Sequence, residues 1–213
     1  MIHPSTELRF VNETLGYGVF ATALIPCGTI TWAGDDLDQV FSREQFDRLN
    51  PAFQRIVEHF GYTDPEGNQI LCWDHARYVN HSCEPNCMSP GYNFDLAIRD
   101  IQPGEQLSND YGSLNIVCPF DCICGSPRCR THVGPEDILR YAEEWDAKVG
   151  PAFQRISAVD QPLWWLVEEK NEIERVLAGT VSLSSCRSNY DATRLEGLPA
   201  KSIASAAGAA EPH

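Results

Sequence analysis

Long apolar runs and basic residues are both scarce in this sequence. No stretch approaches the ~20 consecutive apolar residues that a membrane span needs, and residues 1–7 lack the basic stretch and apolar run of a secretory signal. We therefore expect an intracellular protein, cytoplasmic or nuclear, without a membrane partner. Thirty acidic residues against sixteen basic ones give a formal charge of −14. That charge argues against direct nucleic-acid binding, which needs a basic face, and favours basic partners.

A disulfide framework is also disfavoured. The chain has nine cysteines, an odd number that cannot pair completely within one molecule. Without export these thiols stay reduced, so metal binding is the better interpretation of any clustered subset. At 213 residues, of which 43% are hydrophobic, the chain is long enough for one packed domain with an appendage.

Short strands are predicted over the first hundred residues, because β-branched and aromatic runs alternate there with glycine and turn residues. The predicted strands cover residues 8–11, 19–21, 29–32, 69–73, 94–98 and 106–108. One helical stretch begins at Ser42, and Pro51 breaks or restarts it.

The character of the chain changes after Arg130. Pro135 favours a helix start, and a second helix is predicted at 161–177. Its apolar stripe, predicted to pack against the domain, comprises Leu163, Leu166, Val167, Ile173, Val176 and Leu177. Residues 180–213 are rich in Ser, Ala and Gly, and we predict disorder there. The hexamer at 51–56 recurs at 151–156, and both copies predict a helix start with proline in the first turn.

Three cysteines form a C-x-C-x4-C run short enough to wrap one ion, namely Cys122, Cys124 and Cys129. Zinc prefers four tetrahedral ligands in structural sites, often all thiolates. Cys83 is the predicted fourth ligand, with Cys87 and Cys118 as possible substitutes; unliganded reduced thiols are the alternative interpretation. A closed four-thiolate site has no position for water, so we predict a structural zinc rather than a catalytic one.

Four motifs in a fixed order resemble those of SET-domain protein lysine methyltransferases. Residues 80–86, Asn-His-Ser-Cys-Glu-Pro-Asn, resemble the family's first signature, and residues 105–112, with their Asp-Tyr pair, resemble the second. Residues 16–21 resemble its N-terminal Gly-x-Gly element, and the C-x-C-x4-C run resembles its post-SET zinc segment. The match covers residues 7–133.

The resemblance implies a mainly β fold with short helices, in which SET-type β-sheets surround a pseudoknot and C-terminal helices follow. We place the SET domain at 7–117, the post-SET zinc segment at 118–133, a C-terminal helical extension at 134–179 and the disordered tail at 180–213.

The resemblance also implies S-adenosylmethionine as methyl donor and a lysine-containing protein or peptide as acceptor; a basic substrate such as a histone would suit the acidic charge. Tyr111 is the predicted catalytic residue, with its hydroxyl near the reacting nitrogen. The cofactor contacts carried over are Gly16, Tyr17, Gly18, Arg77, Asn80, His81 and Tyr111. The alternatives are a SET-fold binding module with little turnover, and a methyltransferase acting on a small-molecule amine. No oligomeric state is predicted.

Two positions depart from the family pattern. Asn109 stands where the family has an aromatic residue two positions before the catalytic tyrosine, and Trp32 stands where it tends to have tyrosine. Both fall near the expected lysine channel, so they bear on the number of methyl groups added and on the substrate class. The insert at 35–68 is expected to contribute to substrate choice.

Overall fold

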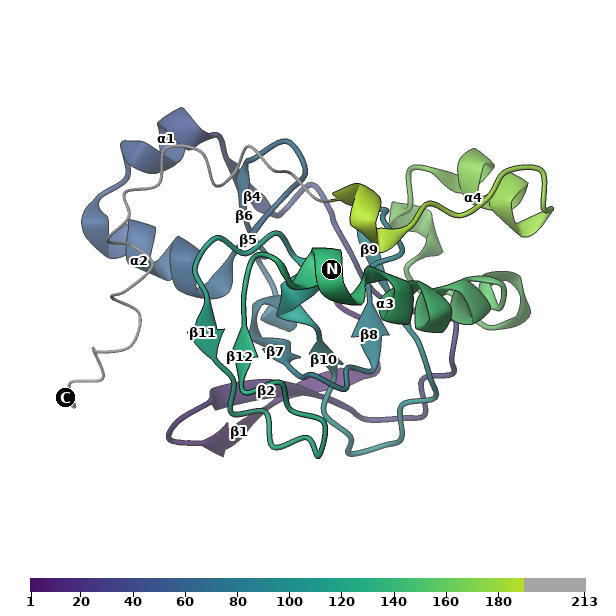
Figure 1. Ribbon diagram of the computed structural model, residues 1–213, viewed down its shortest axis with the longest axis horizontal. Helices are drawn as coiled ribbons and strands as arrows, with labels where there is room; N and C mark the ends of the chain where they lie inside the picture. Colours follow the sequence, from purple (N-terminus) through teal and green to yellow (C-terminus); the bar gives the residue numbers. More distant parts are fainter. Residues whose placement is uncertain (190–213) are drawn as a thin grey trace.

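Short strands and a few helices make up residues 1–189, the part of the chain that the computed structural model describes (Figure 1). The strands are β1 Thr6–Asn12, β2 Gly16–Ala21, β3 Ile30–Ala33, β4 Gln39–Phe41, β5 Tyr62–Thr63, β6 Gln69–Leu71, β7 Asn80–His81, β8 Cys87–Met88, β9 Phe94–Ala97, β10 Ser108–Asn109, β11 Phe120–Asp121 and β12 His132–Val133. The α-helices are α1 Arg43–Asp47, α2 Pro51–Phe60, α3 Asp137–Phe153 and α4 Lys170–Leu177. The 3-10 helices are η1 His75–Tyr78, η2 Tyr111–Ser113, η3 Ile156–Ala158, η4 Trp164–Leu166 and η5 Cys186–Asn189. This confirms the predicted mainly β architecture with short helices.

The strands pair in small sheets, and one pairing brings distant motifs together. The antiparallel sheets are β1-β2, β3-β9-β8, β4-β6-β5 and β11-β12. The remaining pair, β7 and β10, is parallel, with Ser108 opposite Asn80 and Asn109 opposite His81. This pair lies near the middle of the molecule, with the β1-β2 hairpin below it and the insert of α1, α2 and β4-β6-β5 at the upper left (Figure 1). The parallel pairing therefore positions both signature segments side by side.

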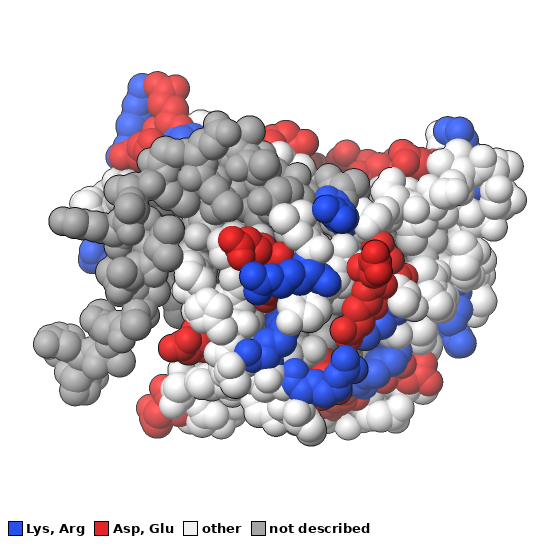
Figure 2. Space-filling view, in the orientation of Figure 1, with Lys and Arg blue, Asp and Glu red and all other residues white. Residues whose placement is uncertain are grey.

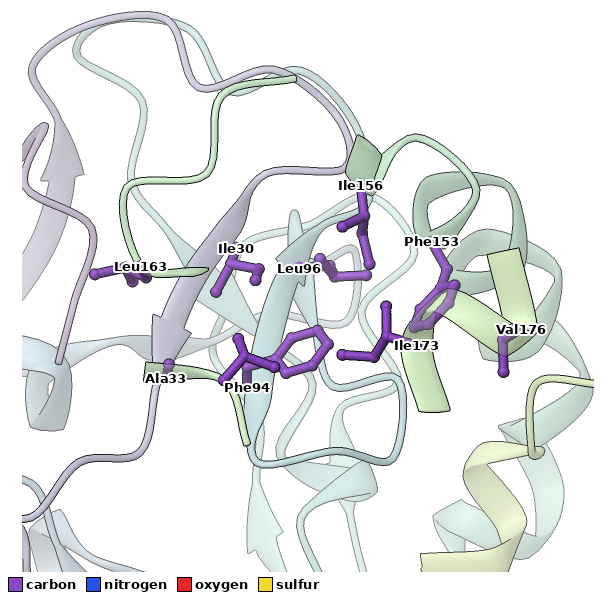
Figure 3. Packing of buried hydrophobic residues seen from close by; sticks show 10 residues of the cluster. Ile30, Ala33, Phe94, Leu96, Phe153, Ile156, Leu163, Ile173 and Val176 are labelled. Carbon is purple, nitrogen blue, oxygen red and sulfur yellow. The ribbon is translucent and has the colours of Figure 1, made fainter. Parts of the chain in front are cut away.

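The largest apolar cluster joins the β3-β9 sheet to the C-terminal helices (Figure 3). Phe94 and Leu96 of β9 are buried there together with Phe153 of α3 and Ile173 of α4. Burying a large apolar side chain contributes about 1.5 to 3 kcal/mol relative to leaving it exposed. The helical extension is thus packed against the β3-β9 sheet.

The predicted stripe at 161–177 is confirmed as packing, but the single helix predicted for it is wrong. Its side chains are buried in the large cluster or packed against it. The backbone, however, forms η4 and then α4, because Val167 is extended, with φ −69° and ψ 125°. Gln161 fixes the start of this segment to β3, since its amide donates to the Gly28 carbonyl and accepts from Ile30 N, both at 2.8 Å.

The two copies of the repeated hexamer have different roles. Pro51 begins α2 with Asn50 as its N-cap, so the predicted restart is confirmed. Pro151 instead lies inside the last turn of α3, and the helix start predicted there is wrong. Proline in a helix interior costs ~3 kcal/mol, but the apolar face of α3 continues through it to the fully buried Ala152 and Phe153. Packing on both sides of Pro151 offsets that cost.

The predicted disordered tail is only partly described. Residues 186–189 form η5, and Cys186 is buried beside α3, where its amide donates to Asp146 Oδ1 at 2.8 Å. Order therefore extends past residue 180, because Cys186 packs into a second cluster with Trp145 and Val149. Residues 190–213 lie outside the described residues. Among the described helices, none is both long and apolar enough to cross a membrane.

Charged side chains of both signs lie side by side on the face shown in Figure 2. Local pairing of this kind is present at Glu144, which accepts from Lys148 at 2.7 Å and from Arg128 at 3.3 Å. Acidic and basic side chains are thus interspersed on this face and do not form separate acidic and basic patches.

Candidate functional site

Tyr111 is fixed at both ends by the segment around β7. Its backbone N–H donates to His81 Nδ1 at 3.1 Å, and its hydroxyl donates to the Val79 carbonyl at 2.7 Å. Both contacts follow from the parallel pairing, which places the residues just after β10 alongside β7. The structure thus brings Tyr111, His81 and Asn80 into one unit.

The Gly-x-Gly element approaches Asn80 closely. The Asn80 amide donates to the Tyr17 carbonyl at 2.9 Å. A Cβ at Gly18 would lie 3.0 Å from Gln106 Cδ and 3.1 Å from Asn80 Nδ2, so only glycine fits without a shift of these side chains. Gly16, with φ +69°, makes the turn at the start of β2 that a side chain would strain.

Arg77 makes a different set of contacts from the other predicted cofactor residues. Its guanidinium donates to the Trp73 carbonyl at 2.8 Å and to the Asp74 carbonyl at 3.2 Å. It also lies 5.8 Å from the centre of the Tyr78 ring, which in turn packs edge-on to Tyr17. Arg77 therefore supports η1, one layer behind the exposed Tyr17 ring.

Burial keeps the central side chains neutral. It lowers the pKa of His81 to about 4, although Asp110 nearby opposes the shift. Because Nδ1 accepts from the Tyr111 amide, the neutral ring carries its proton on Nε2, which lies 3.4 Å from Cys83 Sγ. Burial also raises the pKa of Tyr111 to about 12. At neutral pH its hydroxyl is therefore a hydrogen-bond donor and not a phenolate base.

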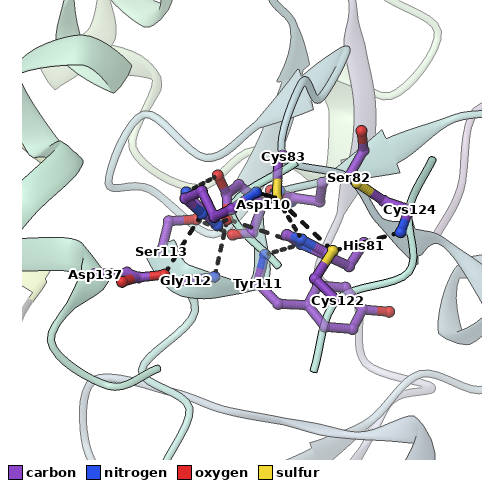
Figure 4. A network of polar contacts seen from close by, with 12 residues as sticks. His81, Ser82, Cys83, Asp110, Tyr111, Gly112, Ser113, Cys122, Cys124 and Asp137 are labelled. Carbon is purple, nitrogen blue, oxygen red and sulfur yellow. Dashed lines mark hydrogen bonds and ion pairs between the residues drawn. The ribbon is translucent and has the colours of Figure 1, made fainter. Parts of the chain in front are cut away.

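Sulfur atoms gather next to this unit (Figure 4). Cys83 Sγ and Cys122 Sγ are 3.7 Å apart, close to the ~3.8 Å between sulfurs that share a tetrahedral zinc with bonds of about 2.3 Å. Among the described residues, the donor atoms of His81, Cys83, Cys122 and Cys124 lie within 4.8 Å of one another. Cys129 adjoins this group, with its sulfur 3.5 Å from the Cys122 carbonyl. The predicted substitutes, Cys87 and Cys118, are not in the group.

Backbone amides point at all four predicted sulfur ligands. At 3.4 Å, Cys83 accepts from Arg130 N, Cys122 from Cys124 N and Cys129 from Thr131 N. Burial opposes ionisation of Cys124, but amide hydrogen bonds from Cys83 and Ser126 outweigh it and lower its pKa to about 7. Burial raises the pKa of Cys83 and of Cys122. Adjacent thiolates repel one another, so a soft cation is what this donor set fits.

Comparison with known proteins identifies the fold. Residues 16–112 match the family model described as SET domain. Over these residues the chain has the SET-domain fold. It is 30% identical over 136 residues to the protein named "Putative histone-lysine N-methyltransferase ASHH4" of Arabidopsis thaliana, a match covering 58% of this chain and 38% of that protein.

A second relative, "Histone-lysine N-methyltransferase Set2" of Drosophila melanogaster, is 26% identical over 150 residues, or 64% of this chain and 6% of that protein. The solved methyltransferase domain of human "Histone-lysine N-methyltransferase SETMAR" covers 62% of this chain and 58% of its own, with 21% identity and a TM-score of 0.43. The chain thus spans well under half the length of these two curated relatives.

A buried ion pair joins the SET domain to the residues that follow it, and none of the sequence motifs predicts this pair. Asp110 is fully buried and accepts two hydrogen bonds from Arg130, at 2.6 and 2.8 Å. It also accepts from Trp145 Nε1 at 3.2 Å and from Gly112 N at 3.1 Å. The available signals were an acid directly before Tyr111 and an arginine directly after the last cysteine of the run.

The two departures from the SET pattern meet at one further acid. Asn109 is buried, and its amide donates to Asp95 Oδ2 at 2.8 Å. Trp32 lies opposite Asp95 in the β3-β9 ladder, with its ring 5.6 Å from that of Tyr62. Tyr62 belongs to β5, which lies within the predicted substrate-choice insert at 35–68.

Proposed function

We propose that this chain transfers a methyl group from S-adenosylmethionine to the side-chain amine of a lysine in a protein. The supporting observation is Tyr111, whose hydroxyl donates to the Val79 carbonyl while its amide donates to His81. The names of the relatives, two histone-lysine N-methyltransferases, favour a histone or another basic protein as substrate. The charge of −14 would attract such a substrate.

The chain's part in this reaction is to hold both reactants and to keep the amine neutral. S-adenosylmethionine supplies a methyl group that is already electrophilic, and Gly16, Tyr17, Gly18, Asn80 and His81 would bind it. The close approach of Gly18 to Asn80 fits that role, because a side chain there would fill the cradle. Free lysine has a pKa of about 10.4, and an apolar channel disfavours its ammonium form. Positioning of the amine then contributes much of the rate.

Tyr111 would act on the amine as a fixed neutral group. Its raised pKa keeps the hydroxyl protonated, and its hydrogen bond to Val79 fixes the direction of that hydroxyl. The hydroxyl and carbonyl oxygens together present partial negative charge, which stabilises the positive charge that develops on nitrogen during transfer. Arg77, which contacts Trp73 and Asp74, would contribute through η1 rather than directly.

A structural zinc bound by Cys83, Cys122, Cys124 and Cys129 forms part of the proposal. His81 is a poorer fourth ligand than Cys129, because ligation through Nε2 would move the proton to Nδ1, opposite the Tyr111 amide. Each of the four sulfurs accepts a backbone amide, which suits thiolates. The zinc segment at 118–133 and the helical extension at 134–179 would then support the SET domain without entering the chemistry.

The decisive experiment supplies radiolabelled S-adenosylmethionine and a panel of lysine-containing proteins, including histones and their lysine-to-arginine variants. We expect transfer to lysine, and a rate lower by about 100- to 1,000-fold in Tyr111→Phe, as when one preorganised transition-state contact is removed. Tyr92→Phe is the matched control, since that hydroxyl lies 3.4 Å from Glu172 at the surface. Cofactor binding without transfer to any protein would favour a binding module, and transfer only to free amines a small-molecule enzyme.

A further inference from the structure

Within residues 1–189, the Asp95 carboxylate has no cationic partner. It is partly buried on β9, and within residues 1–189 the Asn109 amide is the single side chain that hydrogen-bonds to its carboxylate. Oδ2 accepts that bond, so Oδ1 is left without a donor from the described residues, and none of their cations lies within ion-pair distance. Carboxylates withdrawn from water are normally paired. A group from outside the chain would complete this one.

The carboxylate faces the side of the sheet that leads to Tyr111. Along β9, Phe94 and Leu96 point into the large cluster with the C-terminal helices (Figure 3). Asp95 alternates with them and so lies on the opposite face. Trp32, its cross-strand partner, packs on that face against the cluster that includes Val79. Val79 is the residue whose carbonyl accepts the Tyr111 hydroxyl.

Two aromatic rings adjoin the carboxylate. Trp32 and Tyr62 meet edge to face with 5.6 Å between ring centres. Burial raises the pKa of the Tyr62 hydroxyl, and Asp95 is among the acids that raise it further, so the two groups are within electrostatic range. The Trp32 indole N–H is itself buried without an acceptor in the described part of the chain. A carboxylate beside Trp and Tyr rings is a suitable environment for an alkylammonium ion, through a charge-assisted hydrogen bond and cation–π contacts.

We infer that Asp95, held by Asn109 and flanked by Trp32 and Tyr62, binds the ammonium form of the target lysine as it arrives, including its methylated forms that retain an N–H, before proton loss gives the neutral amine that accepts the methyl group. The inference rests on the proposed function for the identity of the ligand, and it makes Asp95 a specificity-determining residue. It also assigns a role to both departures from the SET pattern: Asn109 orients the acid, and Trp32 supplies an aromatic surface. Burial raises the pKa of Asp95 to about 7, and a bound ammonium would favour its ionised form.

The test measures ammonium binding directly, without methyl transfer. The full chain, labelled with ¹⁵N in its tryptophan indoles, is titrated with N-acetyl-lysine methylamide and its monomethyl and dimethyl forms at pH 8. N-acetyl-norleucine methylamide, whose side chain ends in a methyl group at the Cε position and lacks the ammonium, is the matched neutral probe. We expect a saturable shift of the Trp32 indole N–H, assigned with Trp32→Phe, for the charged probes and not for norleucine. This comparison needs no variant in the carboxylate.

Asp95→Asn keeps the shape and removes the charge, and we expect it to weaken binding of the charged probes by about 10- to 100-fold, as when a hydrogen bond to a charged group is lost. Asp160→Asn, which removes an exposed acid outside the 35–68 insert, should leave binding unchanged. Equal binding of norleucine and lysine probes, or equal binding by wild type and Asp95→Asn, would overturn the assignment. Methyl transfer is scored separately, so loss of this site with transfer intact refutes the inference alone, whereas ammonium binding without transfer refutes the proposed enzyme activity alone.

Discussion

Arg130 and Asp110 form a two-pronged, almost solvent-free ion pair that joins the residue after the cysteine run to the residue before Tyr111. The guanidinium also lies 3.6 Å from Asp137 and 4.7 Å from the centre of the Tyr141 ring, both in α3. The Arg130 backbone N–H meanwhile donates to Cys83 Sγ. One residue thus connects the thiol cluster, the first helix of the extension and the candidate catalytic segment.

Replacing Arg130 should therefore cost far more than replacing its neighbour Arg128. In Arg130→Met, Asp110 keeps its bonds from Trp145 and Gly112 but loses its cation inside the protein. Breaking a buried pair in this way typically costs about 3 to 5 kcal/mol, and we expect that loss in urea unfolding together with reduced methyl transfer.

Arg128→Met is the control, because the Arg128–Glu144 pair is exposed and such pairs contribute about 0 to 1 kcal/mol. Similar unfolding midpoints for the two variants would show that the buried pair does not support the fold. If Arg130→Met is destabilised but transfers methyl groups at the wild-type rate, the ion pair has a structural role only.

The sequence identified the parts of the site that are local in the chain. The Asn-His signature, the Asp-Tyr signature and the cysteine run each carry their chemistry within eight residues, so their patterns were readable without a structure. Their order along the chain then indicated the fold. The parallel pairing of β7 with β10 joins the first two motifs in space as that fold requires.

The contacts that tune the site could not be read in the same way. Asn109 and Asp95 are fourteen residues apart and Arg130 and Asp110 twenty apart, and nothing in either local sequence marks one as the partner of the other. The surroundings of the repeated hexamer also determined its secondary structure. The copy at 51–56 begins α2, whereas the copy at 151–156 contains the end of α3. A local sequence pattern favours a type of secondary structure, and packing against β3 and β9 determined which structure formed.

Removing the proposed zinc should weaken methyl transfer although the metal performs no chemistry. We expect one zinc per chain by elemental analysis. Structural zinc binding contributes on the order of 10 kcal/mol, so treatment with a strong chelator should unfold the segment at 118–133, release Arg130 from Asp110 and lower the melting temperature. Cys83→Ser should lose the metal, whereas Cys118→Ser, which changes an exposed thiol, should keep it. A Cys83→Ser protein with one tightly held zinc would contradict this ligand set.

Gly18→Ala should impair cofactor binding more than stability. The added methyl would meet the Gln106 amide, which is the end of a flexible side chain and can swing away, so the cost in unfolding free energy should stay below about 1 kcal/mol. Asn80, in contrast, is bonded to the Tyr17 carbonyl and must shift with it. We expect calorimetry to show affinity for S-adenosylmethionine reduced about tenfold, equivalent to about 1.4 kcal/mol.

The matched control for that change is Gly150→Ala. Gly150 lies in α3 with open space where a Cβ would be, so alanine should leave cofactor affinity unchanged and stabilise the helix by about 0.5 to 1 kcal/mol. Unaltered affinity in Gly18→Ala would mean that the contact between Gly18 and Asn80 does not shape the cofactor site.

Asp95 should make the ligand-free protein less stable as pH rises from 5 to 8. Its pKa is raised by burial to about 7 in the folded state, against 3.8 as its ordinary value. Below pH 3.8 both states hold the proton, and the group has no effect. Between 3.8 and 7 the unfolded state has lost the proton and the folded state has kept it, so each unit of pH favours unfolding. Above 7 the penalty is complete, at no more than about 4 kcal/mol.

Asp95→Asn removes this titration while leaving the position opposite Trp32 filled, so its unfolding free energy should fall less than that of wild type between pH 5 and pH 8. Thiol ligands also titrate in this range, but they do so in both proteins and cancel in the difference. Asp36→Asn should follow the wild-type curve, because that acid is exposed. Adding N-acetyl-lysine methylamide at pH 8 should restore stability to wild type alone, since its ammonium would pair with the ionised carboxylate. If the unfolding free energies of wild type and Asp95→Asn change in parallel with pH, ionisation of Asp95 does not destabilise the fold and the carboxylate needs no cationic partner.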